Sequence, residues 1–163
     1  MEYSQDSSIR RVRVIADYQF GRGAGEILFP EGCTFIRSST GRVRQILLEG
    51  ERLATLRAQD GRLTLSVAGG RRLQRALPFP LRRVVVKDEV APFIAGGRSA
   101  FARHVIGVDP SIRAGDEVLI VDGEDHLLAT GSAVLSGEEV MKFNYGVAVK
   151  VREGRDSGCF REE

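Results

Sequence analysis

A short basic segment in the second half of the sequence has the residue types that bind phosphate. It contains Gly96, Gly97, Arg98, Ser99 and Arg103. Glycines let another molecule approach the main chain closely. Arginine side chains neutralise phosphates, and hydroxyl and amide groups donate hydrogen bonds to them. A helix end followed by a barrel strand with Phe101 in the core explains the same residues equally well, so the segment alone leaves both interpretations open.

Patterns typical of catalysis are weak. Asp122, Glu124 and Asp125 crowd an expected hairpin tip. Paired carboxylates do acid–base work only in a cleft that shifts their pKa. We expect here a solvated turn with ordinary pKa values. The glycines of residues 21–25 lack the Gly-Lys-Ser/Thr of a P-loop, which favours a tight turn between helices. We therefore expect no catalytic residues and no cofactor.

The two cysteines give no reason to expect a metal site. Cys33 and Cys159 lie far apart, and the sequence has no CxxC pair, whereas structural zinc needs four closely spaced ligands. Two unpaired thiols suit a reducing compartment. No apolar run approaches the roughly 18 residues of a membrane helix, and residues 1–9 lack the apolar core of a secretory signal. We expect a cytoplasmic protein without a membrane partner.

Basic residues are unevenly distributed and are mostly arginine. The 163 residues are 42% hydrophobic and 28% charged, as in soluble globular proteins. Residues 1–83 hold 15 Lys and Arg against 8 Asp and Glu, a net charge of +7; residues 84–163 hold 9 against 14, a net charge of −5. Of the 24 basic residues 21 are Arg, which binds phosphate bidentately. Either a nucleic-acid partner or GC-rich codon usage explains this composition.

A proline-rich segment divides the chain. Pro78 and Pro80 forbid regular helix and extend their neighbours, and the sign of the net charge changes nearby. We expect a first domain at residues 1–80, a second at 81–155 and a flexible tail at 156–163.

The first domain is expected to contain an antiparallel sheet. Residues 11–14 fit either a strand or one face of a helix. After Pro30, turn signals recur about every ten residues, the last at Gly69-Gly70, and between them lie apolar segments. These segments predict a meander with strands at 43–48, 53–57 and 63–67.

The second domain is expected to be a compact mixed barrel with short strands and two helices. Asp88 is expected to cap a helix that ends at Gly96-Gly97, and Ser136 to Glu139 form a capping-box pattern. The predicted strands are 84–86, 117–121, 127–135 and 146–151. The fold class is therefore α+β, a mixed domain followed by a β-barrel.

Residues 82–154 resemble the PUA domain of pseudouridine synthases and archaeosine transglycosylases. The resemblance is carried in order by residues 83–86, 96–102, 115–118, 128–131 and 146–150. Residues 16–25, 40–44 and 54–61 resemble the domain that precedes PUA in archaeal tRNA-guanine transglycosylases. Nearly the whole chain is thus similar to the C-terminal end of that enzyme, without its catalytic aspartates and zinc cluster.

The resemblance implies a PUA-type β-barrel and an RNA partner, with tRNA held by its acceptor stem in a setting of tRNA modification. Gly96 and Gly97 would allow backbone approach, Arg98, Ser99 and Arg103 would bind phosphate, and Lys150 would add charge. A stand-alone, non-catalytic tRNA-binding protein of archaeal type is the main interpretation. The alternatives are a subunit that works with a separate catalytic transglycosylase chain, a translation or ribosome-associated factor, and a protein-binding adaptor.

Overall fold

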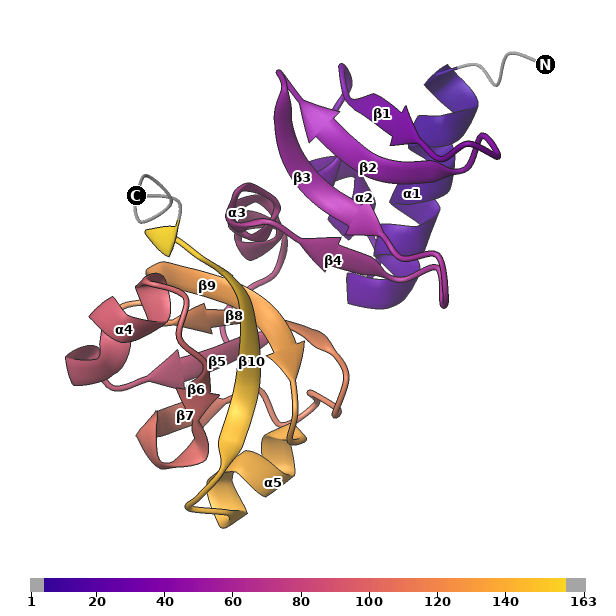
Figure 1. The fold of residues 1–163 in the computed structure, drawn as a ribbon. Coiled ribbons are helices and arrows are strands. Elements are labelled where there is room, and N and C mark those ends of the chain that lie inside the picture. Colours follow the sequence, from indigo (N-terminus) through magenta and orange to yellow (C-terminus); the bar gives the residue numbers. More distant parts are fainter. Residues whose placement is uncertain (1–4, 158–163) are drawn as a thin grey trace. The chain divides into compact units, whose positions relative to one another are not determined.

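The computed structural model describes residues 5–157, with side chains from Ser7 onward. The chain divides into two compact units, of which the first ends at Ala76 and the second begins at Leu77 (Figure 1). Within the described residues no helix is both long and apolar enough to cross a membrane.

The first unit combines helices with a four-stranded antiparallel sheet in the order β1-β2-β3-β4 (Figure 1). Its elements are α1 (Gln5–Phe20), α2 (Ala24–Leu28), β1 (Thr34–Arg37), β2 (Val43–Leu48), β3 (Glu51–Leu56), β4 (Leu63–Leu65) and α3 (Val67–Ala76). The sequence pattern of residues 11–14 fitted either a strand or a helix, and in the structure these residues lie within α1. Val12, Ala16 and Phe20 are buried at intervals of four residues, and this stripe decides in favour of helix. As expected, a glycine turn joins α1 to α2, with positive φ at Gly21 and Gly23.

The turn expected at Gly69-Gly70 is wrong, because both glycines lie inside α3. A Cβ on Gly69 would lie 2.0 Å from the backbone oxygen of Leu53 on β3. These glycines therefore allow the helix to contact the sheet backbone, and the close approach offsets their poor helix propensity. Sequence alone does not distinguish this use of glycine from a turn.

The second unit is a six-stranded, barrel-like sheet in the order β6-β10-β9-β8-β5-β7. Its strands are β5 (Arg83–Val86), β6 (Ala100–Phe101), β7 (Val105–Val108), β8 (Glu117–Val121), β9 (Leu127–Ala133) and β10 (Val147–Gly154). Its helices are α4 (Ala91–Ala95), α5 (Gly137–Lys142) and two short 3-10 turns, η1 (Asp88–Val90) and η2 (Ala102–His104). Neighbouring strands pair antiparallel except β5 and β8, which are parallel. The expected α+β class, with an antiparallel sheet followed by a barrel, is confirmed.

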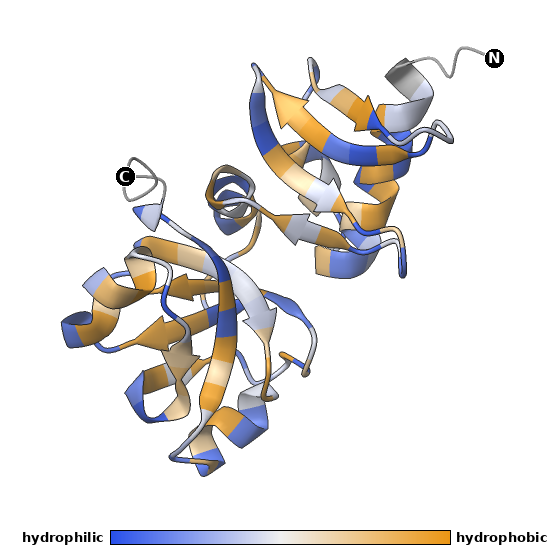
Figure 2. Cartoon of the chain, in the orientation of Figure 1, coloured by the Kyte–Doolittle hydropathy of each residue, from blue (hydrophilic) through white to orange (hydrophobic). Residues whose placement is uncertain are grey.

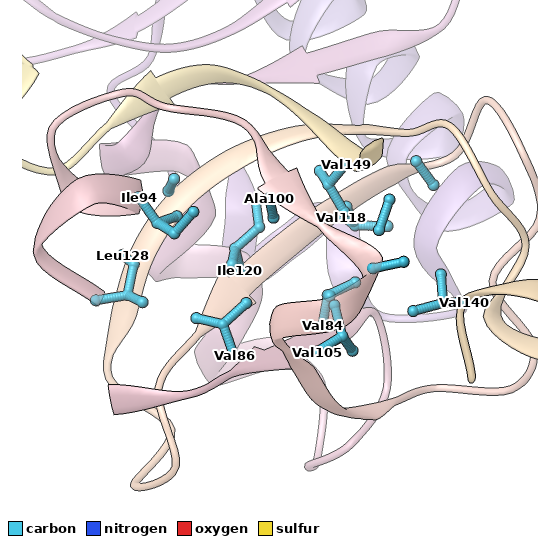
Figure 3. Close-up of a cluster of buried hydrophobic side chains, with 14 of the residues drawn as sticks. Val84, Val86, Ile94, Ala100, Val105, Val118, Ile120, Leu128, Val140 and Val149 are labelled. Carbon is cyan, nitrogen blue, oxygen red and sulfur yellow. The ribbon is translucent and has the colours of Figure 1, made fainter. Parts of the chain in front are cut away.

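The barrel is filled by small and branched side chains from nearly all of its elements. Figure 3 shows Val86 of β5 beside Ile120 of β8, and Val84 of β5 beside Val105 of β7. The strands β5 and β8 are buried along their whole length. In contrast β10 is drawn in Figure 2 with both apolar and hydrophilic positions, and its Val149 is buried while Lys150 is exposed.

The predicted capping box at α5 is confirmed, whereas the predicted cap at Asp88 is wrong. Ser136 accepts a hydrogen bond from the Glu139 amide, and the Glu139 carboxylate accepts one from the Ser136 amide. Asp88 instead begins η1 and makes no capping bond there. Its carboxylate accepts a hydrogen bond from the Gly123 amide at 3.3 Å. The Asp88 carboxylate therefore accepts from a donor on the hairpin loop between β8 and β9 and does not cap a helix end.

A buried arginine joins the start of the barrel to the linker segment. Arg83 is 2% exposed, and its Nη1 donates to the carbonyl oxygens of Leu77 at 2.8 Å and Leu81 at 2.9 Å. Its Nε donates to the carboxylate of Asp125 at 3.2 Å. Asp125 belongs to the hairpin loop between β8 and β9. The carbonyl oxygens of the linker segment therefore accept hydrogen bonds from a buried guanidinium of the second unit.

The expected flexible tail falls mostly outside the described residues, which end at Ser157. The Asp156 amide donates to the Ala95 oxygen at 2.8 Å, and the Ser157 hydroxyl donates to the Gly154 oxygen at 2.8 Å. These two residues thus continue the hydrogen bonding of β10.

Candidate functional site

The basic glycine segment forms the connection from α4 to the edge strand β6. Gly96 has an ordinary helical φ of −77°, whereas Gly97 has a φ of +104°. Only Gly97 therefore needs glycine for its conformation. The amides of Gly97 and Arg98 donate to the carbonyl oxygens of Ile94 and Phe93, both at 3.0 Å. Because these amides are used within the turn, side chains must supply most contacts to a ligand.

A second glycine, which the sequence analysis did not single out, supports this segment from below. A Cβ on Gly154, at the end of β10, would lie 2.3 Å from the Ala95 oxygen and 2.7 Å from the Gly97 nitrogen. The turn thus rests directly on the backbone of the last strand. Packing against a distant segment requires glycine at this position, and no local sequence pattern indicates that requirement.

Strand pairing brings most of the predicted site residues to one edge of the sheet. In the antiparallel pair of β6 and β10, Ala100 lies opposite Val149. Ser99 precedes Ala100 and Lys150 follows Val149, so their backbones are close. Arg98 and Lys150 are both exposed. Arg103 lies further along, on η2, and is also exposed.

The three basic side chains are available to bind an anion. Among residues 7–157, Arg98, Arg103 and Lys150 form no ion pair. The guanidinium carbon of Arg103 lies 5.6 Å from the ring centroid of Phe101, and Arg103 Nε is 3.2 Å from His104 Nε2. Stacking on an aromatic ring reduces the conformational freedom of an arginine while leaving its charge at the surface.

Exposed aromatic side chains accompany these cations. Phe101 is 42% exposed, so the alternative that places it in the core is wrong. The buried Ala100 and Ala102 on either side direct Phe101 outward. Phe143 and Tyr145 are 41% and 75% exposed, with ring centroids 6.1 Å apart. The Ala102 amide donates to the Gly146 oxygen at 2.9 Å, which holds this loop beside β6. The exposure of Phe101 could have been predicted from the sequence, because the small residues Ala100 and Ala102 alternate with it along the strand.

The acidic hairpin tip is structural, but its pKa values are not all ordinary. Burial raises the pKa of Asp122, yet hydrogen bonds from the His126 amide, the His126 ring and the Glu124 amide outweigh this and lower it. The expectation of an ordinary pKa is therefore wrong for Asp122. Asp125 is engaged with Arg83. Both carboxylates hold the loop together.

Asp109 is a buried carboxylate that the sequence analysis did not consider. It is 3% exposed. Burial raises its pKa, but bonds from the Arg82 amide and from the amide and hydroxyl of Ser111 lower it below the usual value. The distances are 2.8 Å, 2.9 Å and 2.7 Å. Three donors thus keep Asp109 ionised as an anchor for the β7–β8 loop.

Within the described residues, no three His, Cys, Asp or Glu side chains form a group able to hold a metal ion. Cys33 is buried, and burial raises the pKa of its thiol. Cys159 lies outside the part of the chain that the structure describes.

The barrel of the second unit belongs to a known class of domain. Residues 82–155 match the PUA domain, and residues 10–80 match the patch-forming domain C2 of tRNA-guanine transglycosylase. The chain thus consists of these two domains in series.

Curated relatives with both domains are tRNA-guanine(15) transglycosylases. The protein of Pyrococcus abyssi is 48% identical over 155 residues, which are 95% of this chain and 26% of the relative. That of Methanothermobacter thermautotrophicus is 50% identical over 145 residues, 88% of this chain and 22% of the relative. The chain spans about a quarter of the length of these relatives and corresponds to their C-terminal part. The resemblance expected from the sequence is confirmed.

Solved structures share the fold at low identity. A hypothetical protein of Pyrococcus horikoshii superposes with a TM-score of 0.71 at 22% identity, covering 92% of this chain and 91% of that one. A conserved PUA domain protein of Thermoplasma acidophilum gives a TM-score of 0.64 at 21% identity, covering 98% and 95%. These likenesses support the same succession of an α+β domain and a PUA barrel. The site residues themselves stay a prediction.

Proposed function

We propose that this chain binds folded tRNA through its PUA domain, in the service of tRNA modification, and that it does not itself carry the base-exchange chemistry. The observation that carries the proposal is the match of residues 82–155 to a PUA domain, within a chain about half identical to tRNA-guanine(15) transglycosylases. The basic edge at Arg98, Arg103 and Lys150 supplies the contacts.

The chemistry of this edge suits an RNA backbone. Its cations have no carboxylate partner among residues 7–157, so a phosphate can bind without displacing an internal ion pair. A-form grooves hide base identity from most side chains, and shape with phosphate contacts therefore dominates recognition. Gly97 and Gly154 set the path of the main chain, and Arg98, Ser99, Arg103 and Lys150 provide the donors.

Arg98→Ala and Arg103→Ala are each expected to weaken tRNA binding by about 5- to 150-fold. The fold-change corresponds to about 1–3 kcal/mol, the usual free energy of a charge-assisted hydrogen bond. The measurement is a filter-binding or fluorescence titration with unmodified tRNA transcript. Arg113→Ala is the matched control, because Arg113 is an exposed arginine of the same domain outside this edge. Its affinity should equal that of the wild type.

Thermal unfolding of the three variants should match that of the wild type, since all three side chains are exposed. If Arg98 and Arg103 can both be replaced with unchanged affinity, the RNA binds another face of the domain.

A second candidate is that the chain works as the tRNA-binding subunit beside a separate catalytic chain. It is favoured by the high identity to the C-terminal quarter of a transglycosylase. Base exchange in folded tRNA needs an extrusion pocket and a positioned nucleophile. The carboxylates of the hairpin tip and Asp109 are occupied as structural groups.

Labelled guanine or a 7-deazaguanine is expected not to enter tRNA when this protein is added alone. The assay is repeated with candidate chains that carry only a catalytic barrel. Incorporation by the lone protein would refute the non-catalytic role, whereas incorporation only in the mixture would establish the subunit role.

A further inference from the structure

A concave, arginine-lined surface lies on the first unit and includes none of the site residues assigned above. It consists of two adjoining cavities of about 620 and 300 Å³ that share Arg11, Arg42 and Val43. Arg37 lines the larger cavity, and Arg44 and Arg57 line the smaller. We call this surface the arginine groove. Its arginines come from α1, from β1 and from the loops and strands that follow.

The groove has no acidic residue in its lining. Apart from its arginines, the lining residues are Ser7, Ser8, Ile15, Thr40, Gly41, Val43, Leu56, Ala58 and Gly61. A third cavity of the same unit, about 280 Å³, differs in this respect: its three arginines, Arg71, Arg72 and Arg75, are accompanied by Glu49 and Glu51. Two carboxylates therefore offset part of the positive charge in the third cavity, whereas no lining carboxylate offsets the positive charge in the arginine groove.

Some of these arginines are fixed and others are available. Arg37 donates to the Ser8 hydroxyl at 2.6 Å and to the Gly41 oxygen at 3.1 Å, so its guanidinium is held at the rim. Arg57 pairs with Asp60. Within residues 7–157 the side chains of Arg11 and Arg42 form no hydrogen bond or ion pair, and both are exposed. Two available cations shared by adjoining cavities can contact neighbouring anionic groups of one ligand.

We propose that the arginine groove binds the phosphodiester backbone of the RNA as a second contact zone, separate from the PUA edge. This proposal rests on the proposed function, because it assigns the same RNA a second site on the chain. Guanidinium groups match phosphate oxygens in a planar, bidentate geometry. A lining of five arginines with no carboxylate suits a polyanion with repeated charges.

The test compares two double variants of the full chain that each remove two positive charges from the first unit. Arg11→Gln with Arg42→Gln changes the groove, and Arg71→Gln with Arg75→Gln changes the third cavity. Affinity for tRNA transcript is measured from 50 to 300 mM salt. The groove variant is expected to bind about tenfold more weakly, with a log–log salt slope shallower by about 1.4–1.8, because two phosphate contacts are lost. The control variant should keep the wild-type slope.

The outcomes separate this inference from the proposed function. A groove variant with the wild-type slope, while Arg98→Ala weakens binding, overturns the groove and keeps the PUA site. Equal losses in both double variants also overturn it, since net charge would then explain the effect. Absence of tRNA binding by the wild type overturns both proposals. Circular dichroism and thermal unfolding of each variant check that the fold is retained.

Discussion

Arg83→Met is expected to lower the free energy of unfolding of the second unit by about 3–5 kcal/mol, because it removes one partner of a buried charge network. The guanidinium holds the carbonyl oxygens of Leu77 and Leu81 and the carboxylate of Asp125. Methionine fills a similar volume but donates no hydrogen bond. The buried bond to the Leu77 oxygen and the partly buried bond to the Leu81 oxygen would then be lost, and a buried acceptor left without a donor costs about 1–3 kcal/mol.

Urea denaturation followed by circular dichroism measures this loss. Asp125→Asn is the informative comparison, because the Asp125 side chain is 32% exposed and water can replace part of its contact with Arg83. It should cost clearly less than Arg83→Met. A loss below about 1 kcal/mol for Arg83→Met would contradict the role assigned to the linker carbonyls.

The affinity of the wild type for tRNA is expected to fall about 40-fold between 50 and 200 mM salt if only the three cations of the PUA edge contact phosphates. Each neutralised phosphate releases counterions, and three contacts on a duplex give a log–log slope of about −2.7. With the two available cations of the arginine groove engaged as well, five contacts would give a slope of about −4.5 and a loss of about 500-fold.

The measurement is a titration at several salt concentrations with one tRNA transcript and a double-stranded DNA of equal length as the control for general polyanion binding. Affinity that does not change with salt would contradict phosphate contacts at both surfaces. Equal affinity for the DNA would contradict a preference for A-form geometry.

Elements with a complete local signal could be predicted from the sequence. The capping box at Ser136 and the strand at residues 84–86 depend on neighbouring residues only, and both appear in the structure. Gly69, in contrast, has the local signature of a turn but lies in a helix. Its close contact is with the backbone of Leu53, which lies outside any local sequence window around Gly69. The predicted helix cap at Asp88 is wrong for a similar reason. Its carboxylate accepts a hydrogen bond from the Gly123 amide, which is distant in the sequence.

The candidate site was only partly predictable. Arg98, Ser99 and Lys150 could be named from composition and resemblance, and strand pairing brings them to one edge. The contribution of Gly154 could not be predicted, because its contact with Ala95 joins two segments far apart in the chain. The arginine groove was missed for the same reason: Arg11 and Arg42 come from a helix and a loop that only the folded sheet brings together.

The position of β6 in the sheet has a consequence for synthesis of the protein. β6 is an edge strand whose partner in the sheet is β10, and the turn before β6 rests on Gly154 at the end of that strand. A nascent chain that has not yet exposed Val147–Gly154 outside the ribosome therefore lacks the support for Gly97 and Arg98. The edge formed by β6 and the turn before it is therefore completed only after Val147–Gly154 has emerged, so this part of the domain cannot fold strand by strand as its residues appear.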